Sequence, residues 1–331
     1  MSRLRTLIEH FKGKRVVVFG DLVADVFVYG EISRISREAP VLILNHRETQ
    51  TVPGGGANAI HNLWALGARP VPVGIVGDDA EGNQLVQYFS NLEIDVSAIR
   101  VAKSYRTPTK MRILAGAVHS QRQQIVRLDS GGPLPVPNDR GQVNAGIEQK
   151  LKLALANADA LLVSDYGYGL VTPQLISKVR TNGIPATIDS RFSLESFSQM
   201  TAATPNEPEV EAALGEPIGN DAKKLEWAGR TLLRKLKHDA LLITRGKDGM
   251  ALFERGKKTA HIPIHGTDEI ADVTGAGDTV IATFTLALAA GGNYYEAAQL
   301  ANYAGGIVVM KYGTRPVTYD ELLKAVEDDI S

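Results

Sequence analysis

The residues best suited to chemistry lie in one short segment near the end of the chain, Asp272–Asp278, which reads DVTGAGD. Gly275, Ala276 and Gly277 are small, so their backbone N–H groups can converge on one ligand atom. An apolar helical pattern follows, and the N-terminus of a helix carries a partial positive charge. The segment therefore predicts a binding site for an anion such as a phosphate group.

Asp278 lies in the first turn of that expected helix, close to the bound anion. A carboxylate there repels a phosphate unless it serves the group that attacks the phosphate. An ordinary Asp has a pKa of about 3.9, so it is ionised at neutral pH and can accept a proton from a hydroxyl group. This indicates phosphoryl transfer with Asp278 as the base. In the alternative interpretation, Asp278 is only a first-turn charge at an ordinary helix N-terminus.

A second glycine segment, Gly54-Gly55-Gly56-Ala57-Asn58, also precedes a helical pattern. Its spacing differs from the G-x-G-x-x-G fingerprint of dinucleotide enzymes, and the first expected strand ends in Gly20-Asp21 without that fingerprint. A dinucleotide-dependent enzyme is therefore disfavoured. A catalytically silent binding module is disfavoured too, because both a base and an anion site are present.

Composition narrows the class of protein further. The chain has 331 residues, 44% of them hydrophobic, which suffices for a large α/β domain. Its formal net charge of −1 favours neither nucleic acid nor an anionic membrane as a partner. The absence of cysteine excludes disulfides and thiolate metal sites and fits a cytoplasmic protein. The N-terminus lacks the features of a signal peptide, and the apolar stretch Val280–Ala290 is too short to span a membrane.

The elements that position these residues follow from the hydrophobic pattern. Short apolar runs predict strands at residues 15–20, 25–29, 41–48, 71–76, 109–114, 123–129, 160–164, 186–189, 240–244 and 249–253. Helical periodicity predicts helices near residues 1–14, 60–66, 82–92, 140–156, 221–236, 277–290, 294–311 and 318–328. The regular alternation after residue 140 is typical of a mainly parallel sheet covered on both faces. The early strands lack intervening helices, so they are expected to form a small separate β-sheet.

The two glycine segments resemble the two signatures of the ribokinase-type (PfkB) carbohydrate kinases and occur in that family's order. The resemblance extends from about Val16 to Leu323. It implies a single kinase domain over residues 1–331, with a doubly wound α/β sheet and a β-sheet lid at about residues 25–50 and 107–129. It also implies that Asp278 is the catalytic base and that the backbone of Gly275, Ala276 and Gly277 stabilises the transferring charge.

The resemblance further implies ATP as the phosphate donor and Mg²⁺ as its metal. Asn206 and Glu209 match the family's Asn-x-x-Glu element, which organises Mg²⁺ through water molecules. By themselves these two residues fit a solvated acidic turn as well. Asp272 and Thr274 match positions that hold a monovalent cation such as K⁺ in some members.

Two further segments acquire nucleotide-binding roles from the resemblance. Thr244, Gly246 and Gly249 match a strand end that lines the nucleotide phosphates, and such strand ends are where open α/β sheets bind ligands. Asn302 and Gly313 fall where the family builds its adenine pocket. A packed helix and loop explains these last two residues equally well.

The sugar site is expected around Asp25, which matches a carboxylate that binds sugar hydroxyls in the family. A carboxylate accepts strong hydrogen bonds from paired hydroxyls. Asn58 would add an amide to the same sugar, and Gly55 and Gly56 would permit close approach of the backbone. The alternative for Asp25 is a charge on an edge strand.

Longer segments resemble one branch of the family, the bacterial kinases of D-glycero-β-D-manno-heptose 7-phosphate. These segments lie at residues 20–25, 29–30, 33–41, 109–112, 124–129, 164–166 and 272–278. The branch implies transfer of the ATP γ-phosphate to the anomeric hydroxyl of heptose 7-phosphate, in ADP-heptose synthesis for lipopolysaccharide. A phosphorylated sugar needs cations in its pocket, although each candidate alone also fits a solvated surface charge. The candidates are Arg34, Lys110, Arg112, Arg127 and Arg191.

Two positions depart from this branch. It usually has lysine where this chain has Tyr168, and Asp-Pro-Lys-Gly where this chain reads Asp189-Ser190-Arg191-Phe192. A lost cation is what a change of substrate would produce, and Arg191 could compensate for it. The alternative is therefore a family member for another sugar or nucleoside, of the fructose, ribose or adenosine type. The lid is expected to offer a surface for a homodimer, and adenylylation is expected from another protein because no nucleotidyltransferase domain follows.

Overall fold

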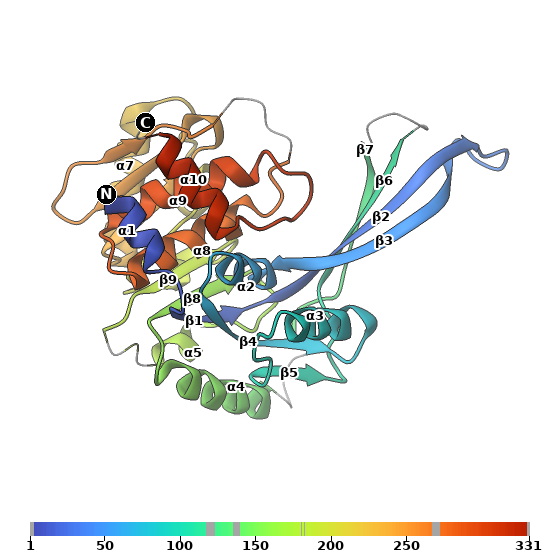
Figure 1. The fold of residues 1–331 in the computed structure, drawn as a ribbon, viewed down its shortest axis with the longest axis horizontal. Coiled ribbons are helices and arrows are strands. Elements are labelled where there is room, and N and C mark those ends of the chain that lie inside the picture. The colour runs from blue at the N-terminus through green and yellow to red at the C-terminus, as the bar shows by residue number, and fades with distance from the viewer. Residues whose placement is uncertain are drawn as a thin grey trace.

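The computed structural model describes residues 3–116, 123–134, 140–179, 181, 183–266 and 272–329. Its strands form two sheets, one in the body of the molecule and one in an arm that projects from the body (Figure 1). No helix in these ranges is long and apolar enough to cross a membrane.

Within the described residues, the sheet of the body has nine strands. In spatial order they are β13 (Ala260–Ile262), β12 (Met250–Glu254), β11 (Ala240–Thr244), β10 (Ala202–Ala203), β9 (Ala186–Ser190), β8 (Ala160–Asp165), β1 (Arg15–Gly20), β4 (Arg69–Gly77) and β5 (Ile99–Ala102). The sheet of the arm has the order β3 (Leu42–Gly55), β2 (Leu22–Ile35), β6 (Thr109–Gly116) and β7 (Gln123–Ser130). The helices are α1 (Arg3–Glu9), α2 (Gly56–Ala65), α3 (Ala80–Asn91), α4 (Arg140–Leu155), α5 (Pro173–Ser177), α6 (Glu207–Leu214), α7 (Ala222–Leu236), α8 (Ala276–Ala289), α9 (Tyr294–Val308) and α10 (Tyr319–Asp328).

Helices cover both faces of the large sheet. Successive residues of a strand face opposite sides, and β1 shows the consequence. Val16 and Val18 belong to one buried cluster with side chains of α2, α8, α9 and α10, whereas Val17 and Phe19 belong to another with side chains of α4 and α7. The strands from β11 to β5 pair in parallel, and β12 and β13 add an antiparallel edge. The predicted doubly wound, mainly parallel sheet is confirmed.

Parallel strands bring their carboxyl ends to one edge of a sheet, which is where open α/β sheets bind ligands. Helix α8 begins near this edge and is fixed by two polar contacts. Thr279 Oγ1 donates a hydrogen bond to Asn62 Oδ1 of α2 (3.1 Å). Thr285 Oγ1 lies 2.6 Å from Thr187 Oγ1 of β9. Both contacts are buried, so the N-terminus of α8 has a defined position relative to the sheet.

The arm continues directly from the carboxyl end of β1, because a single residue, Asp21, separates β1 from β2. Strand β2 pairs antiparallel with β3 and parallel with β6, which pairs antiparallel with β7. The predicted β-sheet lid is confirmed, and within it the strands predicted at residues 109–114 and 123–129 pair with each other. Residues 117–122, which the prediction places in the lid, lie outside the described residues.

Strands β2 and β3 are longer than the pattern predicts. The turn expected at residues 30–40 begins only after Ile35, and each strand has 14 residues, so β2 spans roughly 45 Å. Register shifts after Tyr29 and after Ile32 allow the pairing to continue through a polar sequence. Most residues at the far end of both strands are exposed, so no buried face imposes the alternation that marks a strand.

The hydrophobic pattern of the sequence does not reveal the short elements. Strands β5, β10 and β13 have four residues or fewer, too few for a period to be visible. Helix α6 begins in the acidic segment after Pro205, where the sequence also fits a turn. A capping box at its start, between Asn206 and Glu209, makes this segment helical.

Candidate active site

The segment predicted to bind an anion forms the N-terminus of α8. Gly275 is the residue before the helix and has a positive φ of 78°, a conformation that favours glycine. A side chain at Gly275 would also collide with Asn58, since an added Cβ would lie 2.5 Å from Asn58 Nδ2. Gly277 faces open space, with no atom of the described chain within 4 Å of an added Cβ. The helix N-terminus is therefore accessible to a ligand.

Asp278 is buried in the first turn of α8, with 3% of its surface exposed. Asn58 Nδ2 donates a hydrogen bond to its Oδ2 (3.0 Å), and the Tyr166 hydroxyl donates one to its Oδ1 (2.8 Å). Burial raises the pKa of Asp278. The two hydrogen bonds and the charge of Lys110 lower it, but burial has the larger effect, and the resulting pKa is about 6. The carboxylate is therefore mostly ionised at neutral pH and can accept a proton.

The glycines of the second segment make room for the side chains of this site. A Cβ on Gly54 would lie 2.6 Å from Asp25 Oδ2, and one on Gly55 would lie 3.1 Å from the ring of Tyr166. A Cβ on Gly56 would lie 2.9 Å from the carbonyl oxygen of Asp21. The segment ends β3 and begins α2, so the glycines lie where the arm meets the body.

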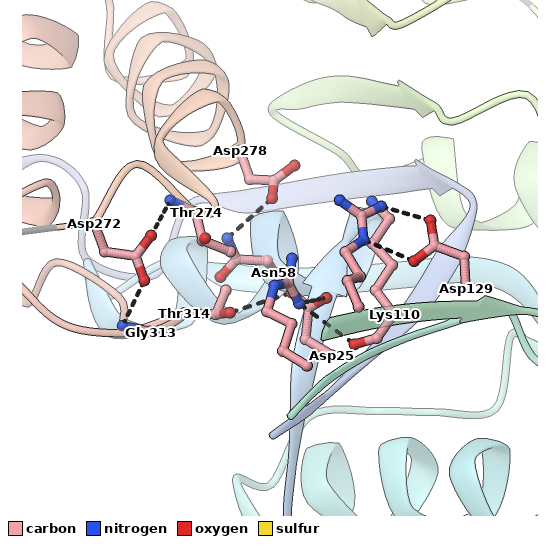
Figure 2. Close-up of polar contacts among 11 residues, drawn as sticks. Asp25, Asn58, Lys110, Asp129, Asp272, Thr274, Asp278, Gly313 and Thr314 are labelled. Atoms are coloured by element: carbon pink, nitrogen blue, oxygen red, sulfur yellow. Dashed lines mark hydrogen bonds and ion pairs between the residues drawn. The ribbon is translucent and has the colours of Figure 1, made fainter. Parts of the chain in front are cut away.

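Asp25 is 4% exposed, so it is not the solvated edge-strand charge of the alternative interpretation. Arg112 Nη1 donates a hydrogen bond to Asp25 Oδ1 (2.8 Å), and Thr314 Oγ1 donates one to Oδ2 (3.2 Å). Strands β2 and β6 place this pair together, because Asp25 lies opposite Lys110 and Phe27 opposite Arg112. Figure 2 shows Asp25, Asn58, Thr314 and Lys110 clustered beside Asp278.

Lys110 lies between the two carboxylates of the site. Its Nζ is 4.4 Å from the ring centroid of Tyr166. Burial lowers the pKa of Lys110, while the charges of Asp25 and Asp278 raise it. An ammonium group in this position can bind an anionic oxygen of a substrate.

The other predicted cations have different positions and contacts from Lys110. Arg127 forms a two-pronged ion pair with Asp129 on β7 (2.7 and 2.6 Å). Arg191 is exposed and lies over the ring of Phe192. Arg34 is exposed near the far end of β2, nine residues beyond Asp25 and so roughly 30 Å along the strand. Within one chain the structure does not bring Arg34 to the other cations.

The predicted Mg²⁺ element lies beside the predicted nucleotide segment, because Asn206 and Thr244 form a β-bridge. Asn206 and Glu209 cap each other, with Asn206 N donating to Glu209 Oε2 and Glu209 N donating to Asn206 Oδ1 (both 2.9 Å). Burial raises the pKa of Glu209. Burial and the charges of Glu209 and Asp278 raise the pKa of Asp189 well above its ordinary value.

A cation would relieve the repulsion among these carboxylates. Glu209 keeps one oxygen outside the capping box, which fits a hard cation held partly through water. No three His, Asp or Glu side chains of the described ranges are grouped closely enough to enclose a metal directly. The Glu209 oxygen outside the capping box is the feature that fits indirect binding of Mg²⁺.

The remaining predicted nucleotide residues have structural contacts of their own. An added Cβ on Gly249 would lie 2.1 Å from the carbonyl oxygen of Ile262, so close packing alone requires glycine there. Gly246 has a positive φ of 54° and open space beside it. Asn302 Nδ2 donates a hydrogen bond to the carbonyl oxygen of Pro263 (2.8 Å). This bond fits the packed-helix interpretation of Asn302.

Asp272 joins two loops. Its Oδ1 accepts a hydrogen bond from Thr274 N (2.9 Å), and its Oδ2 accepts one from Gly313 N (3.1 Å), as Figure 2 shows. These bonds hold the loop before α8 against the loop after α9. The monovalent-cation role of Asp272 and Thr274 stays a prediction.

Four residues near the site carry no role from sequence reasoning: Asp21, Tyr166, Asp189 and Thr314. Tyr166 follows the buried strand β8, and Asp189 is the penultimate residue of β9. Both lie at the carboxyl edge of the sheet, and that placement is the signal that could have identified them. Thr314 lies in a loop without a regular pattern, so only the folded chain reveals its contact with Asp25.

Comparison with known proteins agrees with this geometry. Residues 14–131 and 138–320 match the family described as pfkB family carbohydrate kinase. The chain is 38% identical over 322 residues to the "Bifunctional protein HldE" of Coxiella burnetii, which covers 96% of this chain and 65% of that protein. It is 38% identical over 331 residues to the protein of the same name from Geobacter sulfurreducens, with coverage of 97% and 65%. The chain thus spans about 65% of the length of these curated relatives.

Solved structures share the fold at low sequence identity. Ribokinase from Arabidopsis thaliana, in complex with ribose and ATP, has a TM-score of 0.72 and 22% identity, and the match covers 96% of this chain and 99% of that one. Phosphofructokinase-2 from Escherichia coli, in complex with potassium, has a TM-score of 0.75 and 17% identity, with coverage of 97% and 100%.

Proposed function

The chain belongs to the pfkB family of carbohydrate kinases, and on that premise we propose that it transfers the γ-phosphate of ATP to a sugar hydroxyl. The acceptor we propose is the anomeric hydroxyl of D-glycero-β-D-manno-heptose 7-phosphate. The observation that carries the proposal is the placement of a buried, hydrogen-bonded Asp278 at an accessible helix N-terminus, beside the polar cluster around Asp25.

In the proposed reaction, Asp278 accepts the proton of the sugar hydroxyl as its oxygen attacks the γ-phosphorus. A bond forms between that oxygen and phosphorus, and the bond to the β–γ bridging oxygen breaks, releasing ADP. Backbone N–H groups at Gly275, Ala276 and Gly277, with the positive end of α8, stabilise the charge on the transferring phosphoryl group. Asp25 and Asn58 hold the sugar hydroxyls so that the acceptor lies near Asp278.

A divalent cation supplies charge neutralisation between the ATP phosphates when it is bound. We assign its indirect binding to Glu209, whose position beside Thr244 follows from the β-bridge of Asn206. Burial and the charge of Glu209 raise the pKa of Asp189, and a cation bound in this region would offset that repulsion. Asp272 and Thr274 are the proposed monovalent-cation residues.

The cations around Asp25 favour a substrate that already carries a phosphate. Lys110 and Arg112 are nearly buried, with 9% and 8% of their surfaces exposed, and β6 directs both toward Asp25. The charge of Arg127 acts on Lys110 as well. A free sugar or a nucleoside gives these buried cations no partner beyond Asp25 and Asp278. The heptose phosphate therefore fits the pocket better than the fructose, ribose or adenosine type of substrate.

A screen of ADP release tests the choice of substrate. Heptose 7-phosphate, fructose 6-phosphate, fructose, ribose and adenosine are compared at equal ATP and Mg²⁺. We expect kcat/KM for heptose 7-phosphate to exceed that for each free sugar by roughly 100-fold or more, because only a phosphorylated sugar can form an additional ion pair with the buried cations. A larger kcat/KM for ribose, fructose or adenosine would replace the heptose assignment with the alternative.

The arm is the proposed lid over the sugar and the proposed surface for a homodimer. Aliphatic side chains are exposed along it: Ile32, Ile35, Val41, Leu42, Ile125, Val126 and Leu128. Exposed apolar clusters of this kind mark interaction sites. A second copy of the chain is the proposed occupant, since the edge strands β3 and β7 also present unpaired backbone groups to it.

A further inference from the structure

Tyr166 follows β8 and contacts the base directly. Its hydroxyl donates a hydrogen bond to Asp278 Oδ1 (2.8 Å), while Asn58 Nδ2 donates to Oδ2 (3.0 Å). The two donors come from different elements, the loop after β8 and helix α2. Both oxygens of the carboxylate are therefore held, each from a separate part of the fold.

Tyr166 is itself held on three sides. Asp21 Oδ2 accepts hydrogen bonds from Tyr166 N (2.8 Å) and from Tyr168 N (3.2 Å), which fixes the backbone of the loop. Gly55 leaves the space that the ring occupies. The ammonium group of Lys110 lies over the ring, 4.4 Å from its centroid. The position of the hydroxyl is thus determined by packing before any substrate binds.

We propose that Tyr166 is a positioning residue for the catalytic base: its hydroxyl and the amide of Asn58 grip the two oxygens of Asp278 and fix the plane of the carboxylate at the N-terminus of α8. The inference rests on the proposed role of Asp278. The terminal torsion angle of an Asp side chain has a broad distribution, so a carboxylate without these two hydrogen bonds spends less time in any one orientation. Tyr166 acts through Asp278 and needs no contact with the substrate.

The charged groups around Asp278 come from several elements and have opposite effects on its pKa. Lys110 on β6 lowers the pKa of Asp278, whereas Asp25 on β2 raises it. The charge of Asp278 in turn raises the pKa of Asp189 on β9. The Tyr166 hydroxyl adds a hydrogen bond to the ionised form. Its removal leaves the other groups unchanged and favours protonation of the carboxylate.

The test is Tyr166→Phe, which removes the hydroxyl and keeps the ring against Gly55 and Lys110. The carboxyl carbon of Asp278 is titrated by carbon-13 NMR in the ligand-free protein, with its signal assigned through Asp278→Asn. We expect the midpoint to rise by about one pH unit in Tyr166→Phe. Tyr88→Phe is the matched control, because Tyr88 is also partly buried and its hydroxyl bonds to His61 (3.1 Å) away from the site.

The pH profile of sugar phosphorylation provides the second readout. The acid limb of kcat/KM should move by the same amount, so the rate at pH 6 falls about fivefold more than the rate at pH 8. The KM for ATP should not change. An unchanged midpoint in Tyr166→Phe, or an equal shift in Tyr88→Phe, overturns the proposal. If no sugar is phosphorylated, the proposed function is wrong. The NMR titration still decides whether the Tyr166 hydroxyl positions the carboxylate of Asp278.

Discussion

At the scale of single residues, the burial of Asp278 has two opposite consequences. It raises the pKa to about 6, which makes the carboxylate a stronger base than an exposed Asp. It also places the pKa within about one unit of neutral pH, so the proposed base loses its function as the pH falls through about 6. Activity is therefore expected to decline on the acid side well above the ordinary pKa of Asp.

Replacing Asp278 with Asn tests its role as base. We expect kcat to fall by about 10²–10⁴-fold, because Asn cannot accept the proton. The Kd for ATP, measured by calorimetry, should stay near its original value. Asp159→Asn is the matched control, because this carboxylate pairs with Lys14 (3.2 Å) on a different part of the surface. Near-normal turnover in Asp278→Asn would remove the residue from the role of base.

The same variant should change stability in a pH-dependent way. The folded state raises the pKa of Asp278, so it binds this proton more tightly than the unfolded chain does. Stability is therefore lost as the pH rises from about 4 to 6, and the loss is complete above that range. Asp278→Asn should have a higher Tm than the original protein at pH 8 and lose that advantage near pH 4. A constant difference in Tm across this range would contradict the assigned pKa.

Residues whose types imply chemistry could be identified from the sequence, whereas their partners could not. Asp278, Asp25 and Asn58 stand out by motif, and the structure places them together. Tyr166 is an ordinary aromatic residue in the sequence and reaches Asp278 across 112 positions. The pairing of Arg112 with Asp25 depends on the register of β2 against β6, which no local pattern encodes.

At the scale of elements, the three glycines at the junction of β3 and α2 shape the proposed sugar site by leaving space. Gly54→Ala introduces a Cβ 2.6 Å from Asp25 Oδ2, so the carboxylate must move. A displacement of this size should raise the KM for the sugar by roughly 10-fold to 100-fold. The KM for ATP should change little, because the proposed nucleotide residues lie on β11 and beyond.

Gly132→Ala is the control for this prediction. Gly132 lies just beyond β7, and nothing in the described chain approaches within 4 Å of an added Cβ. Steady-state kinetics with both substrates varied would measure the two KM values. Equal changes in Gly54→Ala and Gly132→Ala, or an effect of Gly54→Ala on ATP alone, would contradict the packing role of Gly54.

Elements with a buried face could be predicted from the sequence, and elements without one could not. Strands β1, β8 and β11 are mostly apolar and buried, and the predicted bounds agree with the structure to within one residue. The outer halves of β2 and β3 have no buried face, so their hydrogen-bonded pairing leaves no hydrophobic signal. The direction of β12 also required the structure, because an apolar antiparallel strand has the same sequence pattern as a buried parallel one.

At the scale of the whole molecule, the exposed arm predicts self-association. Ile35 is 66% exposed near the tip of the arm. Ile35→Asp should weaken dimerisation by roughly tenfold or more in Kd, because it places a charge in an apolar contact. Light scattering with size-exclusion chromatography over a range of concentrations measures the effect. Leu153→Asp is the control, since Leu153 is 69% exposed on α4.

Two outcomes would contradict this prediction. A protein that is monomeric at every concentration has no dimer to weaken. A dimer that withstands Ile35→Asp but dissociates in Leu153→Asp would place the interface on the body of the molecule rather than on the arm.

The bond between Thr314 and Asp25 joins residues 289 positions apart, and the bond between Asn58 and Asp278 spans 220 positions. A ribosome makes the chain from its N-terminus, so the sugar half of the site is synthesised long before the residues that complete it. A nascent chain that has emerged only as far as α7 has its lid strands and Asp25 but lacks the base. In the proposed reaction, phosphoryl transfer becomes possible only when the last quarter of the chain has folded back onto the first. A partly folded chain is therefore expected to lack the activity proposed for this site.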